Sequence, residues 1–530
     1  MFEDNRTIVL GALLLGLFVL RRYLDFRRAA ASVDNLRGFR TLFSDRFIWF
    51  PFRVKGISPG VQSELNLYRK YKDFEEAGGW DIMAGVNIFP KSEVTLYLAD
   101  PAVAKEVLGA RARFPKPLGP YKVLLAFGPN LVASEGDEWK RQRKLVAPAF
   151  SERNNRLVWD ETIRIMHDLF DNVWGDNDTV VIDNITDLTV PITLLVIGVA
   201  GFGRRITWNE DAVAPPGHEM TFKDALNVVS RNLFYQVLFP RWLLRIGTPA
   251  MRRFDTASRE LGAYMQEMID ARREGGDGVV KGERHDLFSS LLDANEGLAG
   301  EGEKLTDVGL MGNVFIFMVA GKCLTRTSAH TLAYAFILLA LYPDEQEKLY
   351  QAIKETLHDG RTPGYEEFSS FAYSMAVFNE TLRLFPPVIS IPKQSAEDTS
   401  FTTTNAAGET RTVPVPKGTF VTVHTPGLHS NPKHWDEPAA FRPARFLGGR
   451  YNRDAFLPFS GGPRGCIGRG FSETESIAVL TLVISRYRVE VKDEPQFAGE
   501  TFEQRKARLL KSKLSVTLFP ERAPLVFKRR

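Results

Sequence analysis

The chain alternates short β-like stretches with longer runs whose apolar residues recur at helical spacing. Val94–Leu98 combines β-branched and aromatic residues in a short run, which predicts a strand, and Pro101–Leu108 follows it with a helical pattern. Asn313–Pro343 predicts a long central helix that a proline ends, and Phe471–Leu482 predicts an amphipathic helix. No Pro/Gly/Ser-rich linker, low-complexity tract or internal repeat divides the 530 residues. The pattern therefore predicts one large, helix-dominated domain.

The N-terminus carries an uncharged apolar run, Thr7–Leu20, with arginines on both sides. At about 1.5 Å per residue a helix of this length reaches ~21 Å, short of the ~30 Å hydrocarbon core, unless Arg21 and Arg22 snorkel to the interface. The excess of arginine after Leu20 predicts a single-pass anchor in residues 1–28, with residues 29–530 on the cytosolic side. A cleaved signal peptide is the alternative, but its small-residue site, Ala29–Ala31, would follow four arginines.

Composition limits the classes of function. The formal net charge of +4 gives no reason to expect a nucleic-acid partner. With 38 phenylalanines and 44% apolar residues, the chain can bury a core and line an apolar pocket. Two cysteines cannot build a disulfide framework, which indicates a reducing compartment.

One of the two cysteines, Cys466, lies in a glycine-rich turn just before the predicted helix Phe471–Leu482. A thiolate near a helix start is stabilised by the unpaired N–H groups there, so this position suits a nucleophile or an axial metal ligand. A buried structural cysteine is the plain alternative. A phosphate-binding loop is not indicated, because the turn contains neither G-x-x-x-x-G-K nor G-x-G-x-x-G.

The turn matches the pattern F-x-x-G-x-R-x-C-x-G through Phe459, Gly462, Arg464, Cys466 and Gly468. It resembles the haem-binding loop of the cytochrome P450 superfamily. The resemblance implies that the Cys466 thiolate is the axial ligand of heme b (iron protoporphyrin IX), where its electron donation favours O–O cleavage. It also implies that Phe459 packs against the loop, that Arg464 meets a haem propionate, and that the backbone around Gly468 tunes the thiolate.

A basic run, Trp139–Arg143, matches the family's W-x-x-x-R. The i, i+4 spacing places Trp139 and Arg143 on one helical face, where the resemblance implies hydrogen bonds to a propionate. Lys140, Arg141 and Lys144 point elsewhere and resemble a docking surface for an acidic electron donor. A solvated basic helix face is the plain alternative.

A third motif, Glu380-x-x-Arg383, precedes two prolines and is joined by Arg445 of a P-x-R-F sequence. Alone, such a Glu/Arg pair is usually a surface ion pair of little value. The resemblance implies instead a buried structural network of Glu380, Arg383 and Arg445 that fixes the region behind the cysteine loop. Lys393 occupies the position where the family commonly has an arginine that contacts a propionate. The lysine keeps the positive charge but lacks the paired N–H donors of a guanidinium.

One segment departs from the family. Where the central helix normally carries A-G-x-(D/E)-T-(T/S), this chain has Ala320–Ser328, which lacks a carboxylate and is about three residues longer. The family's acid and alcohol relay protons, so we expect Thr327 to be the alcohol, with Thr325 as second choice. A local bulge is one way to absorb the extra residues, and a mis-joined exon is another explanation. Cys323 is expected to be a helix-face residue and not a second ligand.

The resemblance covers nearly the whole chain, up to a strand-rich tail around Leu514–Phe527. It implies a mainly α fold with small β-sheets, the cytochrome P450 fold, a triangular prism of about a dozen helices preceded by one membrane-anchor helix. The implied activity is a monooxygenase that inserts one oxygen atom from O2 into a lipophilic small molecule, plausible in fungal secondary metabolism.

The implied partners are NADPH–cytochrome P450 reductase, with cytochrome b5 left open as a second donor, and the endoplasmic reticulum membrane. Since the Ala320–Ser328 segment is unusual, an isomerase, dehydratase or peroxygenase that needs no reductase is the alternative, and a non-catalytic haem-binding protein is the second. The substrate, its regiochemistry and the oligomeric state are left open.

A second apolar and aromatic run, Asn232–Leu244, is edged by arginines. It resembles the segment over the substrate entrance that dips into lipid in membrane-anchored members. Ordinary packing of a buried helix explains the same pattern, and the sequence leaves both open.

Overall fold

The computed structural model describes residues 2–44, 57, 69–203, 208, 214–273, 286–296, 304–358, 360–514 and 517–530, without the side chains of residues 2–8 and 319–326. The chain forms two compact units. We call the first the sheet unit; it comprises Met1–Pro117, Leu382–Phe441 and Gly449–Cys466. We call the second the helical unit; it comprises Leu118–Thr381, Arg442–Gly448 and Ile467–Arg530.

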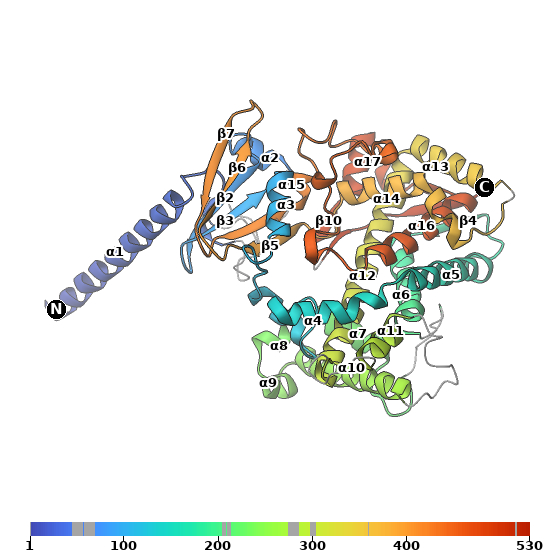
Figure 1. Ribbon diagram of the computed structural model, residues 1–530, viewed down its shortest axis with the longest axis horizontal. Helices are drawn as coiled ribbons and strands as arrows, with labels where there is room; N and C mark the ends of the chain where they lie inside the picture. Colours follow the sequence, from blue (N-terminus) through green and yellow to red (C-terminus); the bar gives the residue numbers. More distant parts are fainter. Residues whose placement is uncertain are drawn as a thin grey trace. The chain divides into compact units, whose positions relative to one another are not determined.

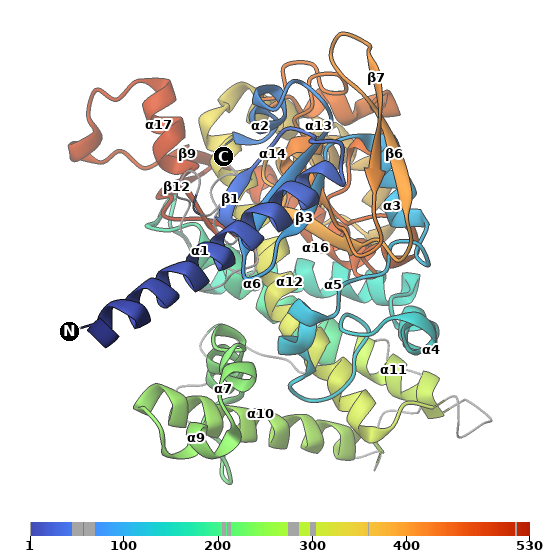
Figure 2. The same cartoon turned by 90° about the vertical axis from the view of Figure 1, so that its left-hand side faces the viewer.

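A five-stranded sheet organises the sheet unit, in the order β1-β2-β3-β8-β5. Strands β2 and β3 pair antiparallel, β3 and β8 parallel, and β8 and β5 antiparallel. A β6–β7 hairpin stands beside α3 (Figure 2). The elements are α1 (Phe2–Ala31), β1 (Arg40–Phe43), α2 (Lys72–Glu76), β2 (Ile82–Phe89), β3 (Glu93–Leu98), α3 (Pro101–Gly109), β5 (Ser390–Gln394), β6 (Thr399–Thr404), β7 (Thr410–Val415), β8 (Phe420–His424) and α15 (Thr425–Leu428).

Helix α1 contains the apolar run at the N-terminus. It leaves the β2–β3 side of the sheet unit as a long, straight helix (Figure 1). Near the middle of α1, the Phe18 ring lies 6.1 Å from that of Phe89 on β2, and the Arg22 guanidinium lies over both rings. Among the described residues, no helix combines the length and the hydropathy that a membrane crossing requires. The predicted transmembrane span is therefore not confirmed.

The helical unit is built from helices that pack around α12 and α16, with a three-stranded β4-β12-β9 sheet and a β10–β11 hairpin. Its helices are α4 (Gly136–Val146), α5 (Glu152–Asp168), α6 (Thr186–Phe202), α7 (Phe222–Arg231), α8 (Tyr235–Leu238), α9 (Arg241–Ile246), α10 (Pro249–Arg273), α11 (Leu287–Glu296), α12 (Asp307–Leu341), α13 (Pro343–Thr356), α16 (Arg469–Arg486) and α17 (Phe502–Leu509), and α14 (Ala372–Leu384) for most of its length. Its strands are β4 (Thr179–Ile182), β9 (Tyr487–Val491), β10 (Ser512–Leu514), β11 (Leu518–Pro520) and β12 (Leu525–Arg529).

These elements confirm the predicted strand at Val94–Leu98, the helices at Pro101–Leu108 and Phe471–Leu482, and the strands near the C-terminus. The mainly helical character with small sheets is likewise confirmed. The central helix is longer than predicted, because Thr306 caps it with a side-chain bond to the Gly309 amide. The bulge considered for Ala320–Ser328 is absent, since the backbone there is α-helical throughout. The extra residues lengthen the helix instead.

Candidate active site

The cysteine loop of the sheet unit turns back on itself just before Cys466. The Cys466 amide donates to the Phe459 carbonyl at 2.8 Å, and the Gly465 amide donates to the Gly462 carbonyl at 3.0 Å. Cys466 is half-buried and lies outside any disulfide. The turn thus presents a reduced thiol on a backbone held by its own hydrogen bonds.

Glycine is required at one position of this loop. Gly462 has φ +62°, and a Cβ there would lie 2.4 Å from the Leu108 carbonyl oxygen at the end of α3. Both the left-handed backbone and the close approach exclude a larger residue. The glycine of the F-x-x-G motif therefore seats the loop on α3.

Two buried side chains hold the chain upstream of the loop. His429 accepts a hydrogen bond from the Leu457 amide at Nε2, at 2.8 Å. Arg383 donates to the carbonyls of His429 (2.9 Å), Pro438 (2.8 Å) and Ala440 (3.1 Å). Burial, helped by the Arg383 charge, lowers the pKa of His429 to about 3, so the imidazole is neutral and can accept. Sequence reasoning missed His429, because a lone histidine carries no motif.

In the helical unit, the carboxylate of Glu380 is fully buried. It accepts from Arg445 Nε at 3.1 Å and from the Arg442 amide at 2.9 Å. A buried carboxylate with a cationic and a backbone donor is well compensated. The sequence motif thus places Glu380 and Arg445 together in this unit, while Arg383 bonds backbone carbonyls of the sheet unit.

Helix α4 presents the W-x-x-x-R motif as its spacing requires. Trp139 is buried and Arg143 half-buried, whereas Lys140, Arg141 and Lys144 are exposed in a set on the other side. Between them, Gln142 accepts at 3.2 Å from Asn313 of α12, whose own side-chain oxygen accepts from the Leu131 amide at 3.0 Å. Sequence reasoning missed this pair, which fixes α4 on α12.

The other predicted contacts of a prosthetic group are placed as follows. Lys393 is buried on β5, opposite Val421 of β8. Phe459 and Arg464 are half-buried in the cysteine loop, and Gly468 is the N-cap of α16. Their predicted roles stay predictions.

On α12, Thr327 is half-buried and its carbonyl accepts from the Thr331 hydroxyl at 2.7 Å. Thr325 and Cys323 have side chains outside the described set, so the predictions about them are neither supported nor contradicted. The next residue, Ser328, bonds Ser472 of α16 through their hydroxyls at 2.9 Å. The end of the unusual segment is therefore fixed against α16.

A buried carboxyl accompanies this contact. Glu475 of α16 has no exposed surface to solvate a charge, and one of its oxygens, Oε1, has no hydrogen-bond partner. Burial raises the pKa of Glu475 to about 8, although a hydrogen bond with Ser328 lowers it in part. The carboxyl is therefore neutral at neutral pH. Its position, four residues from both Phe471 and Val479 on the apolar face, was a signal that sequence reasoning did not use.

The donor set of the sheet unit fits a haem-thiolate centre. The Cys466 thiol lies in a glycine-rich turn and is not part of a disulfide. At Gly462 this turn packs so closely against the end of α3 that there is no room for a Cβ. The buried His429 accepts from a backbone amide at Nε2, so that nitrogen is not available as a ligand. Thiolate ligation through Cys466 is therefore the metal chemistry that this region can support.

Comparisons with known proteins give the class. The sequence model of the family described as Cytochrome P450 matches residues 55–516. The chain is 55% identical over 99% of both sequences to Cytochrome P450 monooxygenase 124 of Postia placenta. It is 30% identical to Cyclooctat-9-en-7-ol 5-monooxygenase of Streptomyces melanosporofaciens, over 68% of this chain and 73% of that one. It is 29% identical to Ganoderic acid synthetase CYP5150L8 of Ganoderma lucidum, over 76% and 80%. The chain belongs to the cytochrome P450 family, and it is a monooxygenase of that family.

Proposed function

We propose that the enzyme takes NADPH electrons from a separate cytochrome P450 reductase and inserts one oxygen atom of O2 into a lipophilic small molecule. The observation that carries this proposal is the turn, held against α3 at Gly462, that carries Cys466 with its thiol outside any disulfide. Heme b, held through the Cys466 thiolate, supplies the activation of O2. Cytochrome b5 is a possible second electron donor.

The chain's own residues divide the remaining work. We assign propionate binding to Trp139, Arg143, Lys393 and Arg464, all four of which are at least half-buried. Glu380, Arg383 and Arg445 keep the surrounding backbone in place. Thr327 is the proposed alcohol that relays protons, and Thr325 is the second choice for this role. The exposed cations Lys140, Arg141 and Lys144 are the proposed docking set for the reductase.

The substrate pocket is expected to be apolar. In the helical unit, Phe315 of α12 is fully buried and its ring lies 4.6 Å from that of Phe127. Relatives named for cyclooctat-9-en-7-ol and for ganoderic acid support a carbon-rich substrate. The fungal relatives, from Postia placenta and Ganoderma lucidum, support the proposed role in fungal secondary metabolism.

Attachment to the endoplasmic reticulum membrane is proposed through α1. Its apolar side chains between Val9 and Leu24 are largely exposed, which is costly in water and favourable in lipid. The catalytic part then lies on the cytosolic side.

The reduced, carbon-monoxide-bound spectrum tests the cysteine. The wild-type enzyme should give a Soret band near ~450 nm, and Cys466→Ser should lose it entirely. Cys323→Ser is the matched control and should keep the band. A 450 nm band that survives in Cys466→Ser would overturn the assignment of the ligand.

The lack of a carboxylate in the Ala320–Ser328 segment of α12 favours one alternative, a peroxygenase or a redox-neutral isomerase. Product formed with NADPH and reductase is compared with product formed on hydrogen peroxide alone. Thr327→Val should raise the ratio of peroxide released to product by roughly tenfold, since one proton-transfer group is commonly worth 10²–10⁴ in rate and water partly replaces it. Turnover on peroxide alone, with none from NADPH, would favour the alternative.

A further inference from the structure

The chain just before α7 holds a histidine between two carboxylates of α10, and the proposed activity does not use it. Residues Pro215–His218 form a tight turn, which the His218 amide closes on the Pro215 carbonyl at 3.1 Å. Pro216 and Gly217 (φ +94°) occupy its second and third positions, as a type II turn requires. The His218 side chain that follows this turn lies against α10 and is only 7% exposed.

Both ring nitrogens of His218 face carboxylates. Nδ1 lies 2.8 Å from Glu260 Oε2, and Nε2 lies 3.2 Å from the carboxylate of Glu267. The ring also stacks on that of Tyr264, with the centroids 3.7 Å apart and the planes 6° apart. Glu260, Tyr264 and Glu267 follow one face of α10, since they are four and three residues apart. One face of α10 therefore surrounds the imidazole on two edges and one side.

All three contacts favour a charged imidazole over a neutral one. A carboxylate oxygen only accepts and a neutral imidazole has one N–H, so both hydrogen bonds form together only when the ring carries two protons. The face of an aromatic ring likewise attracts a cation. The neutral ring must turn one nitrogen lone pair toward a carboxylate, which is repulsive. Since histidine changes its charge between about pH 5 and 8, the contact responds to pH in that range.

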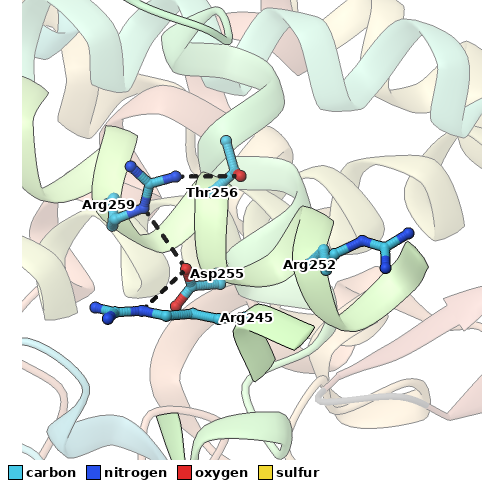
Figure 3. A pocket seen from close by; sticks show the side chains of 5 residues that line it. All are labelled: Arg245, Arg252, Asp255, Thr256 and Arg259. Atoms are coloured by element: carbon cyan, nitrogen blue, oxygen red, sulfur yellow. Dashed lines mark hydrogen bonds and ion pairs between the residues drawn. The ribbon is translucent and has the colours of Figure 1, made fainter. Parts of the chain in front are cut away.

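The charged groups that surround His218 do not produce this response themselves. The Glu219 amide donates to Glu260 Oε2 at 3.1 Å, and the Glu219 carboxylate lies 3.7 Å from Arg259. Arg259 is shared with Asp255, at 3.6 Å, in the cavity that Figure 3 shows. Arginines and ordinary carboxylates keep their charge between about pH 5.5 and 7.5. Among the described groups around this contact, a change of charge in that range therefore falls on His218.

The residues after His218 connect this contact to α7. The Tyr264 hydroxyl donates to the Met220 carbonyl at 2.9 Å. The next residue, Thr221, caps α7 by accepting from the Asp224 amide at 3.1 Å. We call His218–Thr221 the α7 strap, because these residues fasten the start of α7 to α10.

We propose that the α7 strap is fastened to α10 through the charged form of His218 and is loosened when His218 becomes neutral. The neutral ring keeps only one of its two carboxylate bonds, so the first turn of α7 opens more often. The fastened state holds one proton more than the loosened state. Acidification therefore favours the fastened state, and a rise in pH weakens it. Since α7, α10 and α12 share one core that includes Phe315, the strap acts on the apolar region assigned to the substrate, a consequence that rests on the proposed function.

Amide hydrogen exchange of the full chain tests the proposal. It is followed in peptides that cover Phe222–Arg231, at about pH 5.5 and about pH 7.5, and corrected for the intrinsic rate at each pH. In the wild type, protection of the first turn of α7 should be roughly threefold to fivefold higher at the lower pH, as expected for one charge-assisted bond to a partly exposed carboxylate.

Two substitutions of the histidine should remove the difference in opposite ways. His218→Gln has no charge to gain and should show the lower protection at both pH values. His218→Arg carries a permanent charge on a planar group that stacks on Tyr264, so it should show the higher protection at both. A gain of protection at the higher pH is a result that misfolding cannot produce.

Two further variants separate the strap from the rest of the chain. Glu267→Gln changes a carboxylate that is 63% exposed, so the core is untouched, and the difference should shrink to less than about twofold. The matched control is His358→Gln, which removes an exposed histidine beyond the end of α13 and should keep the full difference.

Three outcomes would overturn the proposal. The first is a wild-type protection of α7 that is the same at both pH values. The second is an equal pH difference in the wild type and in His218→Gln. The third is a loss of the difference in His358→Gln as large as that in His218→Gln, which would show a general effect of histidine titration. None of these readouts depends on haem or on turnover, so they fail or succeed apart from the proposed oxygenation.

Discussion

The polar groups behind the cysteine loop and those at the α12–α16 contact are buried to the same degree but paired differently. In the sheet unit, Arg383 bonds three backbone carbonyls, and His429 accepts from a backbone amide at Nε2 while its Nδ1 has no hydrogen-bond partner. In the helical unit, Glu475 keeps one oxygen without a partner. The three bonds of Arg383 hold the backbone in place, whereas Glu475 and His429 each keep one unpartnered atom and a charge state that responds to pH.

The largest expected effect comes from removing the buried hydrogen-bond donor Arg383 in the sheet unit. Arg383→Met would leave buried carbonyls of His429, Pro438 and Ala440 without that donor, and would also remove the cation 5.2 Å from the Trp435 ring. We expect a loss of about 3–5 kcal/mol in the free energy of unfolding, since each orphaned buried group costs about 1–3. Urea denaturation measures it.

Arg361→Met is the control, because the Arg361 side chain is about half exposed and its ion pair with Glu367 should contribute about 1 kcal/mol at most. Equal losses in the two variants would show that burial of Arg383 adds nothing.

The next effect concerns Glu475. Its pKa is raised from the ordinary value of 4.5 to about 8, so between these pH values the unfolded chain has released a proton that the folded chain keeps. Stability must therefore fall as pH rises through this window, by about 1.4 kcal/mol per pH unit. From pH 6 to pH 8 the loss is about 2 kcal/mol, because the slope falls by half as the pH reaches the folded pKa, and Glu475→Gln should abolish it.

Glu473→Gln is the matched control two residues away, where the carboxylate pairs with Arg469 at 2.8 Å. It should retain the wild-type slope. A slope unchanged in Glu475→Gln would show that the carboxyl is ionised in the fold.

The smallest expected effect is a loss of folding stability below pH 6.5, caused by buried histidines of the sheet unit. Burial lowers the pKa of His429 to about 3 and that of His424 to about 4, both from 6.5. The contribution of these two neutral histidines to the free energy of unfolding is fully present well above pH 6.5. It is lost as the pH falls, because the histidines of the unfolded chain take up protons first. His429→Gln keeps an acceptor for the Leu457 amide and should reduce the loss of stability between pH 6.5 and 5.5 by about 1 kcal/mol.

The quantity to compare between the two proteins is the change in the free energy of unfolding with pH, and not its absolute value. If wild type and His429→Gln lose equal free energy on acidification, His429 is not the neutral acceptor of the Leu457 amide.

Motif spacing predicted the parts of the site that depend on local periodicity. Trp139 and Arg143 lie on the same helix face because they are four residues apart. Gly462 is constrained by a glycine-rich loop that its sequence motif already indicates. What spacing could not give are partners far along the chain. The bonds of Asn313 to Gln142 and of His429 to Leu457 join positions without a motif, and tertiary packing alone selects them. The bulge considered for Ala320–Ser328 is absent, since the backbone there is helical throughout.

Helix α12 is held at both ends of its unusual segment. Asn313 ties its first half to α4, and beyond the segment Ser328 bonds α16 while the Tyr334 hydroxyl bonds Ser512 at 2.7 Å. Removing three residues between two such clamps would turn one against the other by about 60° and draw them together by about 4.5 Å. The length of this helix is thus part of the unit's architecture, and a shortened version would need a new set of contacts at one clamp or the other.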